Sequence, residues 1–308
     1  MDSDCSLKTD NMPAEHTSVL AEFAAGIALK KNAVVVDATI GCGGHSRIFA
    51  KSLSKDAVLL GLDIDQNSLT AAQNNLADLP CKVVLVRENF ANLPEVLRQI
   101  GIEKVDLIFA DLGFCSAQLT DPDKGLSFNE DMKLDMRLDD RLTVTAADIV
   151  NSRDEKGLAD LIYNFGQERA SRKIAHSIVF ARDRKKIDTT AELVNIICRA
   201  LKCNPNSRKS RIHPATKTFQ ALRIAVNSEL ENLETLLSSA PEMLAKGGKI
   251  VIISFHSLED RIVKNDFRQK KTSGIYEIAT KKPVIASFDE IRQNPRARSA
   301  KLRMAIKK

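Results

Sequence analysis

The stretch VVVDATIGCGGHS, residues 34–46, decides the fold class of this chain. A run of β-branched residues ends on Asp37 and leads directly into a glycine-rich turn, Gly41 to Gly44. Glycine lets a ligand approach the backbone closely and tolerates positive φ, and a helix that begins near His45 presents unpaired N–H groups. A strand, a glycine turn and a helix in this order predict the first unit of a Rossmann-like α/β fold with a nucleotide-cofactor pocket.

A second strand is predicted at 58–63, and it ends on Asp63, where a ribose-binding carboxylate belongs. The turn reads G-x-G-G and lacks the third glycine of a dinucleotide-binding loop. Asp37 would repel a pyrophosphate but attract a cation. These features favour S-adenosylmethionine, which carries a sulfonium and an ammonium group, over NAD. An NAD-dependent dehydrogenase is the alternative enzyme, and a plain loop capped by Asp37 is the structural alternative.

The composition predicts a globular α/β protein. Its 308 residues, 44% of them apolar, suffice for one large domain or a domain with an inserted lobe. No apolar run approaches the roughly 18 residues of a membrane helix, and the first residues lack a signal-peptide pattern, so we expect a cytoplasmic protein without a membrane partner. Six scattered cysteines without a C-x-x-C pair, and histidines 176 and 213 without partners at ligand spacing, predict neither disulfides nor a metal.

The net charge of +6 is unevenly distributed along the chain. Residues 1–120 hold 10 basic and 15 acidic side chains, whereas 168–217 hold 13 and 4, and 261–308 hold 14 and 4. Short basic clusters neutralise phosphates, although they often mark only a solvated face. The two basic blocks therefore favour a nucleic-acid partner, with these candidate contacts: Arg208, Lys209, Arg211, Arg296 and Arg298.

After an opening helix from about Ser18 to Lys30, strands and helices alternate up to residue 111, which predicts a parallel sheet wound by right-handed crossovers. The pattern then turns helical for about a hundred residues, with one helix expected from Thr190 to Leu201. A long helix, Thr218 to Leu237, is expected to return the chain to the sheet, and residues 245–248 are expected to end the following helix with a C-cap turn. Residues 1–121 and 213–308 are predicted to form the cofactor-binding domain and 122–212 an inserted helical lobe. The seven predicted strands are 33–37, 58–63, 82–87, 105–110, 249–257, 274–280 and 301–308, the last two as an antiparallel hairpin.

Polar side chains follow the predicted strands, and a doubly wound sheet gathers such residues at the carboxyl edge of its strands. Asp63 suits the ribose hydroxyls, because a carboxylate accepts two hydrogen bonds from a diol. Phe90 either covers an adenine or packs in the core, and His45 is assigned to binding rather than to proton transfer. The candidates at this edge are Asp37, Gly43, Gly44, His45, Asp63, Phe90, Asp111, Ser116, Gln118, Ser254, His256 and Ser257.

Asp111 ends the fourth strand and is the first candidate catalytic group, with Ser116 nearby. The exocyclic amine of a nucleobase is a poor nucleophile, because its lone pair is delocalised into the ring. Acceptors that hold the NH2 group can draw that lone pair out of conjugation. Asp111 could equally bind the methionine amino group of the cofactor or cap the chain after the strand.

Several long motifs occur in order along nearly the whole chain: GCGGHS, DLGFCSAQL, DMRLD (135–139), FGQERASRKIA (165–175), HPATKTFQALRIAVNSEL (213–230), SFHSLEDRIVK (254–264) and NPRARSAKLR (294–303). Together they resemble the bacterial small-subunit ribosomal RNA cytosine-N4 methyltransferases, the RsmH or MraW family. The resemblance implies a class I fold dependent on S-adenosylmethionine, with an inserted helical lobe. It also implies, as target, the N4 amine of a cytidine in the decoding region, turned out of its stack.

The resemblance implies cofactor contacts at Gly43, Gly44, His45, Asp63, Phe90, Asp111 and Gln118. This chain departs from the family at Phe114, Cys115 and Phe165, where valine, serine and tyrosine are usual, so a catalytic serine at 115 is absent. The implied partner is small-subunit ribosomal RNA, free or in the assembled subunit, held by the lobe and the C-terminal hairpin; a homodimer is compatible with the sequence. A non-catalytic RNA-binding assembly factor remains open, whereas DLGF disfavours a DNA amino-methyltransferase, which carries [DNS]-P-P-[YFW].

Overall fold

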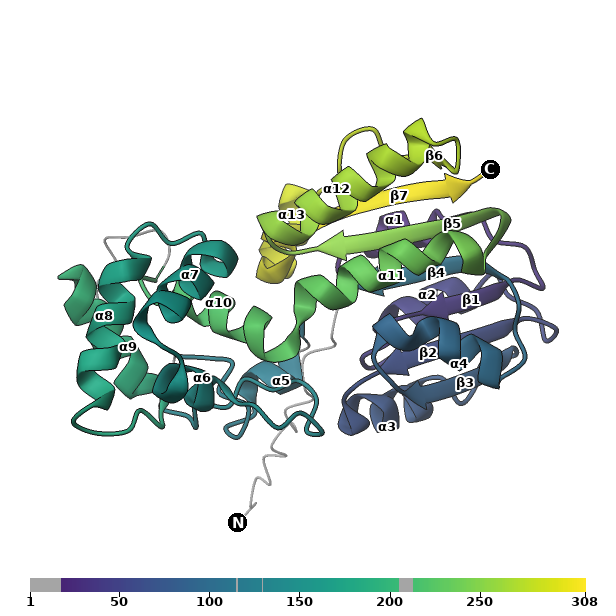
Figure 1. The fold of residues 1–308 in the computed structure, drawn as a ribbon. Helices are drawn as coiled ribbons and strands as arrows, with labels where there is room; N and C mark the ends of the chain where they lie inside the picture. The colour runs from purple at the N-terminus through teal and green to yellow at the C-terminus, as the bar shows by residue number, and fades with distance from the viewer. Residues whose placement is uncertain (1–17, 115, 129, 205–212) are drawn as a thin grey trace, which may run out of the picture.

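The computed structural model describes residues 18–114, 116–128, 130–204 and 213–308, and its centre is one seven-stranded sheet (Figure 1). Its strand order is β3-β2-β1-β4-β5-β7-β6. The first five strands are parallel and β7 is antiparallel to both of its neighbours. This confirms the predicted seven-stranded, mostly parallel sheet. The strands are β1 Val34–Asp37, β2 Val58–Asp63, β3 Lys82–Arg87, β4 Val105–Asp111, β5 Leu244–Ser254, β6 Tyr276–Ile278 and β7 Lys301–Lys307.

Helices cover both faces of the sheet, because successive apolar residues of each strand point to opposite sides. Val35 and Leu107 belong to one core cluster, together with helices α1 (Ala21–Ala25), α2 (Gly44–Ala50) and α3 (Gln66–Asn75). Val36 and Ile108 belong to the other, with α4 (Leu93–Gln99), α11 (Glu229–Met243) and α12 (Ser257–Thr272). The fully apolar strands are thus buried on both sides, as expected of a parallel sheet.

A helical lobe follows β4 and lies beside the sheet domain, with α5 between them (Figure 1). The lobe has its own core cluster, the third in the molecule, which is built around Leu134, Leu158, Ile174 and Ile197. Capping boxes at Thr145 and Thr189 begin two of its helices. The helices are α5 Ser116–Thr120, α6 Ala146–Ser152, α7 Glu155–Gly166, α8 Ser171–Arg182, α9 Thr190–Leu201 and α10 Thr216–Asn227.

The prediction of one long helix from Thr218 to Leu237 is wrong. The chain breaks at Ser228, which adopts a left-handed φ of 47° between α10 and α11. Phe219 and Leu222 of α10 pack in the core of the lobe, whereas α11 covers the sheet. The division into residues 122–212 and a flanking sheet domain stays a prediction, and we propose that the lobe continues to Asn227.

Two local predictions are also wrong. Residues 245–248, expected as a turn that ends a helix, lie within β5, where the register with β4 shifts and Gly247 takes a φ of 78°. Glycine permits this irregularity in a strand. The opening helix, expected from Ser18 to Lys30, is limited to α1, because Gly26 follows its last residue.

β6 and β7 pair as the predicted antiparallel hairpin, and their connection carries α13 (Phe288–Gln293) and the short 3-10 helix η2 (Pro295–Ser299). Within the described part of the chain, no helix is both long and apolar enough to cross a membrane. Among the described cysteines, Cys81, Cys198 and Cys203 are free thiols.

Candidate active site

The carboxyl ends of β1, β2 and β4 bring together the acidic residues predicted to form the site. Asp63 Oδ2 accepts a hydrogen bond from the N–H of Gly41 at 2.9 Å, which ties the end of β2 to the glycine turn. The N–H of Asp111 donates to Thr39 Oγ1 at 2.7 Å, which ties the end of β4 to the end of β1. We call Asp37, Asp63, Asp111 and Glu259 the carboxylate rim.

The glycine turn requires small residues at two places. Gly43 caps α2 with a φ of 87°, and a Cβ there would lie 3.0 Å from Leu76 Cγ. A Cβ on Gly44 would lie 2.4 Å from Ser18 Oγ. Glycine is therefore favoured at both positions by the packing of Leu76 and Ser18 against the turn and, at Gly43, also by its positive φ.

His45, in the first turn of α2, is buried and lies between the backbone and Asp111. Its Nε2 lies 2.8 Å from the carbonyl oxygen of Val19, so Nε2 carries the hydrogen of that bond. Its Nδ1 lies 3.7 Å from Asp111 Oδ2. The ring packs on Phe109 with centroids 4.6 Å apart. The histidine thus positions the start of α2 beside Asp111.

Burial raises the pKa of the rim aspartates. The pKa of Asp37 rises to about 7, although Ser46 Oγ donates to it at 2.7 Å. The pKa of Asp63 rises to about 6, although the N–H groups of Asp65 and Gly41 stabilise its charge. Burial raises the pKa of Asp111 well above its usual range, and the charges of Asp37 and Glu259 add to this. Such a cluster favours a cation as ligand.

Asp111 differs from its neighbours in its hydrogen bonding. Its Oδ1 is buried and has no hydrogen-bond partner among the residues that the structure describes. The side chain as a whole keeps 24% of its surface exposed. Asp37, in contrast, is 1% exposed and is enclosed by Ser46 and Thr39. A ligand at the rim would therefore find an unused acceptor on Asp111.

The remaining predicted cofactor contacts lie at the ends of β3 and β4. Phe90 begins the 3-10 helix η1 (Phe90–Asn92) and packs half-buried against the core below α4. Gln118 of α5 is buried, and its amide donates to Asp65 Oδ2 at 3.4 Å. Cys115 and the side chain of Ser116 lie outside the described residues.

At the end of β5, the predicted substrate residues are already engaged. Ser254 Oγ donates to the carbonyl oxygen of Lys301 at 3.2 Å, and Ser257 Oγ donates to Gln167 Oε1 in the lobe at 2.7 Å. His256 caps α12: its Nδ1 accepts the N–H of Glu259, and its Nε2 lies 3.3 Å from Glu259 Oε1.

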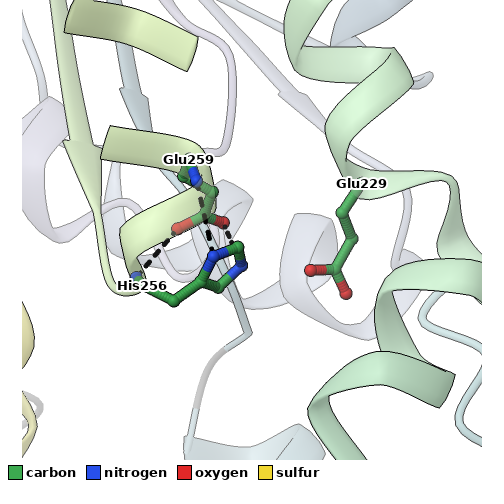
Figure 2. A group of neighbouring side chains, drawn as sticks. All are labelled: Glu229, His256 and Glu259. Atoms are coloured by element: carbon green, nitrogen blue, oxygen red, sulfur yellow. Dashed lines mark hydrogen bonds and ion pairs between the residues drawn. The ribbon is translucent and has the colours of Figure 1, made fainter. Parts of the chain in front are cut away.

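Glu259 and Glu229 flank His256 from two different helices (Figure 2). Burial alone would raise the pKa of Glu259, but the hydrogen bond and charge of His256, the N–H of Phe255 and the charge of Arg223 lower it. Arg223 also binds Glu229, with Nε–Oε1 at 2.7 Å. The three side chains place ligand atoms within 4.8 Å of one another, but Arg223 already neutralises one carboxylate, so the group suits positioning better than metal binding.

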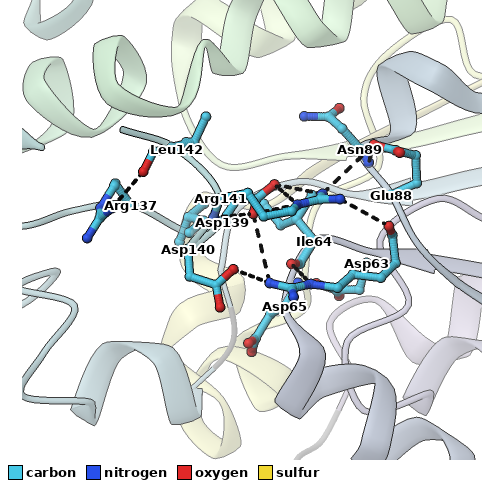
Figure 3. A network of polar contacts seen from close by, with 12 residues as sticks. Asp63, Ile64, Asp65, Glu88, Asn89, Arg137, Asp139, Asp140, Arg141 and Leu142 are labelled. Carbon is cyan, nitrogen blue, oxygen red and sulfur yellow. Dashed lines mark hydrogen bonds and ion pairs between the residues drawn. The ribbon is translucent and has the colours of Figure 1, made fainter. Parts of the chain in front are cut away.

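A polar network links the lobe to the cofactor side of the sheet (Figure 3). Arg141 forms a salt bridge with Asp139, with Nη2 2.8 Å from Oδ2. The same Nη2 lies 3.9 Å from Oε1 of Glu88, which follows β3. Arg87, at the end of β3, pairs with Asp140 and donates to the carbonyl oxygen of Ile64 at 3.1 Å. The segment around Asp139 is thereby held over the ends of β2 and β3.

Some site residues were not predicted from the sequence. Glu259 could have been found, since His256 and Glu259 have the spacing of a capping box. Arg223, Glu229 and the Arg87–Asp140 pair carry no local signal, because their partners come from separate elements.

The predicted phosphate contacts are only partly described. Arg296 and Arg298 lie in η2, whereas Arg208, Lys209 and Arg211 lie outside the described residues. We call residues 281–301 the cationic segment, because they hold six basic and two acidic side chains.

A sheet of this order, with acidic groups gathered at its carboxyl edge for a cationic cofactor, defines a class I methyltransferase dependent on S-adenosylmethionine. The chain belongs to the MraW methylase family, whose profile matches residues 13–308.

Two relatives carry the name ribosomal RNA small subunit methyltransferase H. The one from Picosynechococcus sp. is 48% identical over 94% of this chain and 96% of its own. The one from Koribacter versatilis is 46% identical over 95% of this chain and 94% of its own. Among solved structures, a methyltransferase from Streptococcus mutans in complex with SAH matches with a TM-score of 0.44 and 13% identity, covering 94% of this chain and 95% of that one.

Proposed function

We propose that this protein transfers the methyl group of S-adenosylmethionine to the exocyclic N4 amine of a cytidine in the decoding region of small-subunit ribosomal RNA, with the base turned out of its stack. The names of the relatives support the RNA substrate. The observation that carries the choice of an amine is Asp111, which offers a buried acceptor atom without a partner among the described residues.

The residues of the rim fit the cofactor. S-adenosylmethionine, when bound, supplies an electrophilic methyl group on a positively charged sulfur. Asp63 uses one lone pair of each oxygen for the N–H groups of Gly41 and Asp65, and the others remain for ribose hydroxyls. Gly43 and Gly44 are proposed to contact the cofactor through their backbone, and Phe90, at the start of η1, is proposed to cover the adenine. Asp37 contributes negative charge from behind the turn.

Asp111 is the proposed acceptor for the target amine. A hydrogen bond from the N4 amine to its carboxylate would localise the nitrogen lone pair and orient it in line with the methyl group. The carboxylate must be ionised for this role, and a neighbouring cation lowers the pKa of an acid that burial has raised. A bound S-adenosylmethionine would supply such a cation and would favour the ionised form of Asp111. Ser116 remains a proposed catalytic neighbour.

The end of β5 is proposed to hold the base. His256 is fixed by Glu259, and Ser257 connects the same turn to the lobe through Gln167. Ser254 supports this turn from below by its bond to Lys301. The base would therefore bind between the rim and the lobe, while the basic residues bind phosphates on either side.

The test uses small subunits from a strain that lacks the methyltransferase gene, incubated with the protein and labelled S-adenosylmethionine. Mass spectrometry of the nucleosides should show a new N4-methylated cytidine. The Asp111→Ala variant should bind S-adenosylhomocysteine and yield no such nucleoside. An unmethylated subunit would reject the proposal, and so would a label on another base or atom; equal activity of the variant would remove Asp111 from the chemistry.

A further inference from the structure

A cavity of about 260 Å³ lies next to the proposed base site, outside the carboxylate rim. It is formed by the turn after β5 and by the connection between β6 and β7. Phe255, His256 and Ser257 form one wall, and Ile285, Ile291 and Arg298 belong to the other. Because His256 and Ser257 also belong to the base site, the cavity is continuous with that site.

Two large apolar side chains of the segment that forms one wall of the cavity are exposed. Ile285, which lines the cavity, is 66% exposed, and Phe288, which lies in α13 between the lining residues Ile285 and Ile291, is 89% exposed. They are the two most exposed large hydrophobic residues in the described part of the chain. Exposure of such groups is unfavourable in water and marks an interaction site when the groups lie together.

The charge around the cavity selects the partner. Arg292, Arg296 and Arg298 lie in α13 and η2, and none of their guanidinium groups has an ion pair with a residue that the structure describes. Lys301 and Arg303, by contrast, both pair with Asp260. Unpaired guanidinium groups beside an apolar wall suit a phosphate followed by a base.

We propose that this cavity receives the unpaired nucleotide next to the target cytidine, with its base against Ile285 and Phe288 and its phosphate at Arg298. The inference rests on the proposed function, because it needs a strand that continues from the base site. Its volume is below the roughly 300–1,000 Å³ of pockets that enclose a whole small ligand, and suits one residue of a longer strand.

The chain contains no tryptophan, so Phe288→Trp introduces a single fluorescent reporter at the mouth of the cavity. The probe is a twelve-nucleotide single-stranded RNA with one central cytidine among adenosines, added at low salt with S-adenosylhomocysteine. Stacking of a base should quench the tryptophan, and an abasic site beside the cytidine should remove the quenching. Ile100→Trp, after α4 at the opposite edge of the sheet, is the matched control and should not respond.

Kinetics on gene-deleted small subunits give the second measurement. Phe288→Ala and Arg298→Gln should each raise KM for the subunit about tenfold, a typical loss for one stacked base or one charged contact, with kcat and cofactor affinity unchanged. Unchanged KM and no quenching at position 288 would overturn the cavity assignment while methylation by the unaltered protein upholds the proposed function. Quenching without any methylation would uphold RNA binding in the cavity and reject the reaction.

Discussion

The carboxylate rim and the cationic segment lie next to each other, but they differ in how far their charged groups are exposed to solvent. The rim buries its carboxylates, and burial raises the pKa of Asp37 to about 7 and of Asp63 to about 6. The cationic segment leaves Arg292 and Arg298 exposed and Arg296 partly exposed, without ion pairs to described residues. A buried charge responds strongly to one specific ligand, whereas exposed charges bind a polyanion cumulatively.

The comparison indicates how two ligands of opposite charge are kept apart. A small cation needs a site of few, desolvated acidic groups that cost free energy until it binds. An RNA strand needs many weak contacts that are reversible in salt. The turn after β5, with His256 and Ser257, borders both regions, and there the two substrates would meet.

The largest effect is expected from removing the charge of Asp111, the residue of the carboxylate rim that is proposed to accept a hydrogen bond from the target amine. Asp111→Asn keeps the shape of the side chain but weakens the acceptor, so kcat for subunit methylation should fall about 10²–10³-fold, as for loss of one preorganised group. Binding of S-adenosylhomocysteine, measured by calorimetry, should change little.

Asp63→Asn is the matched variant, because the ribose is common to both forms of the cofactor. It should weaken S-adenosylmethionine and S-adenosylhomocysteine alike. If Asp111→Asn instead weakened both ligands and spared kcat, Asp111 would bind the methionine amino group and the amine acceptor would lie elsewhere.

The second effect is a pH dependence of cofactor binding. Below pH 6 the rim aspartates hold protons, because burial raises the pKa of Asp63 to about 6 and of Asp37 to about 7. Each proton that a ligand must displace costs about a factor of ten in affinity per pH unit below that pKa. Calorimetry from pH 5 to pH 8 should therefore show S-adenosylmethionine binding tighten about ten- to a hundredfold.

S-adenosylhomocysteine lacks the sulfonium charge and should show a smaller change over the same range. Asp37→Asn should reduce the pH dependence for S-adenosylmethionine. Equal pH profiles for the two ligands would mean that the rim does not recognise the sulfonium.

The same pKa shifts predict the pH dependence of folding. The folded-state pKa values of Asp37 and Asp63 lie above the ordinary value of 3.8 for an aspartate, so the folded protein holds more protons than the unfolded chain between about pH 4 and pH 7. The contribution of these two carboxyl groups to the free energy of unfolding is present below pH 4 and is lost as the pH rises through their folded-state pKa values. Urea unfolding of the ligand-free protein should thus show a free energy of unfolding that falls over this window. If the free energy of unfolding did not change with pH, and the Asp37→Asn variant gave the same result, the raised pKa of Asp37 would be contradicted.

Much of the sheet domain could be predicted from sequence, because each apolar strand between turn signals is a local pattern. The strand 82–87 has the same bounds in the structure, and Asp37, Asp63 and Asp111 each end a strand as expected. The lobe helix Thr190–Leu201 was also predicted at its residues, since its capping box and apolar stripe are local.

The errors arose where tertiary packing decides. The apolar pattern continues through Ser228, and only the competing cores of lobe and sheet break the helix there. The glycines at 247 and 248 read as a turn, but pairing with β4 keeps them in a strand. The buried Asp111 Oδ1 without a described partner depends on residues far apart in the chain, so no spacing rule could reveal it. Arg223 and Glu229 are six residues apart, but they meet across the break at Ser228, which the apolar pattern did not predict.

A smaller effect is expected from the cationic segment. Replacing Arg292, Arg296 and Arg298 together with glutamine should reduce the slope of log Kd for single-stranded RNA against log salt by about two, at about 0.7 per phosphate contact. Fluorescence anisotropy between 50 and 200 mM salt measures it. Arg47→Gln is the control, because Arg47 pairs with Asp78 on the surface of α2 and should leave the slope unchanged. Equal slopes for the triple variant and the control would exclude these arginines as phosphate contacts.

The smallest effect is expected from the pair that joins the lobe to the rim. Arg87 and Asp140 keep 28% and 68% of their side chains exposed, and solvent screens such pairs to about 0.2–1 kcal/mol. A double-mutant cycle with Arg87→Ala and Asp140→Ala, followed by urea unfolding, should give a coupling in this range. A coupling above about 2 kcal/mol would show that the segment around Asp139 docks on β3 as tightly as a buried element. In that case the lobe and the cofactor site would form one cooperative unit. The carboxylate rim and the cationic segment would then differ only in their charge.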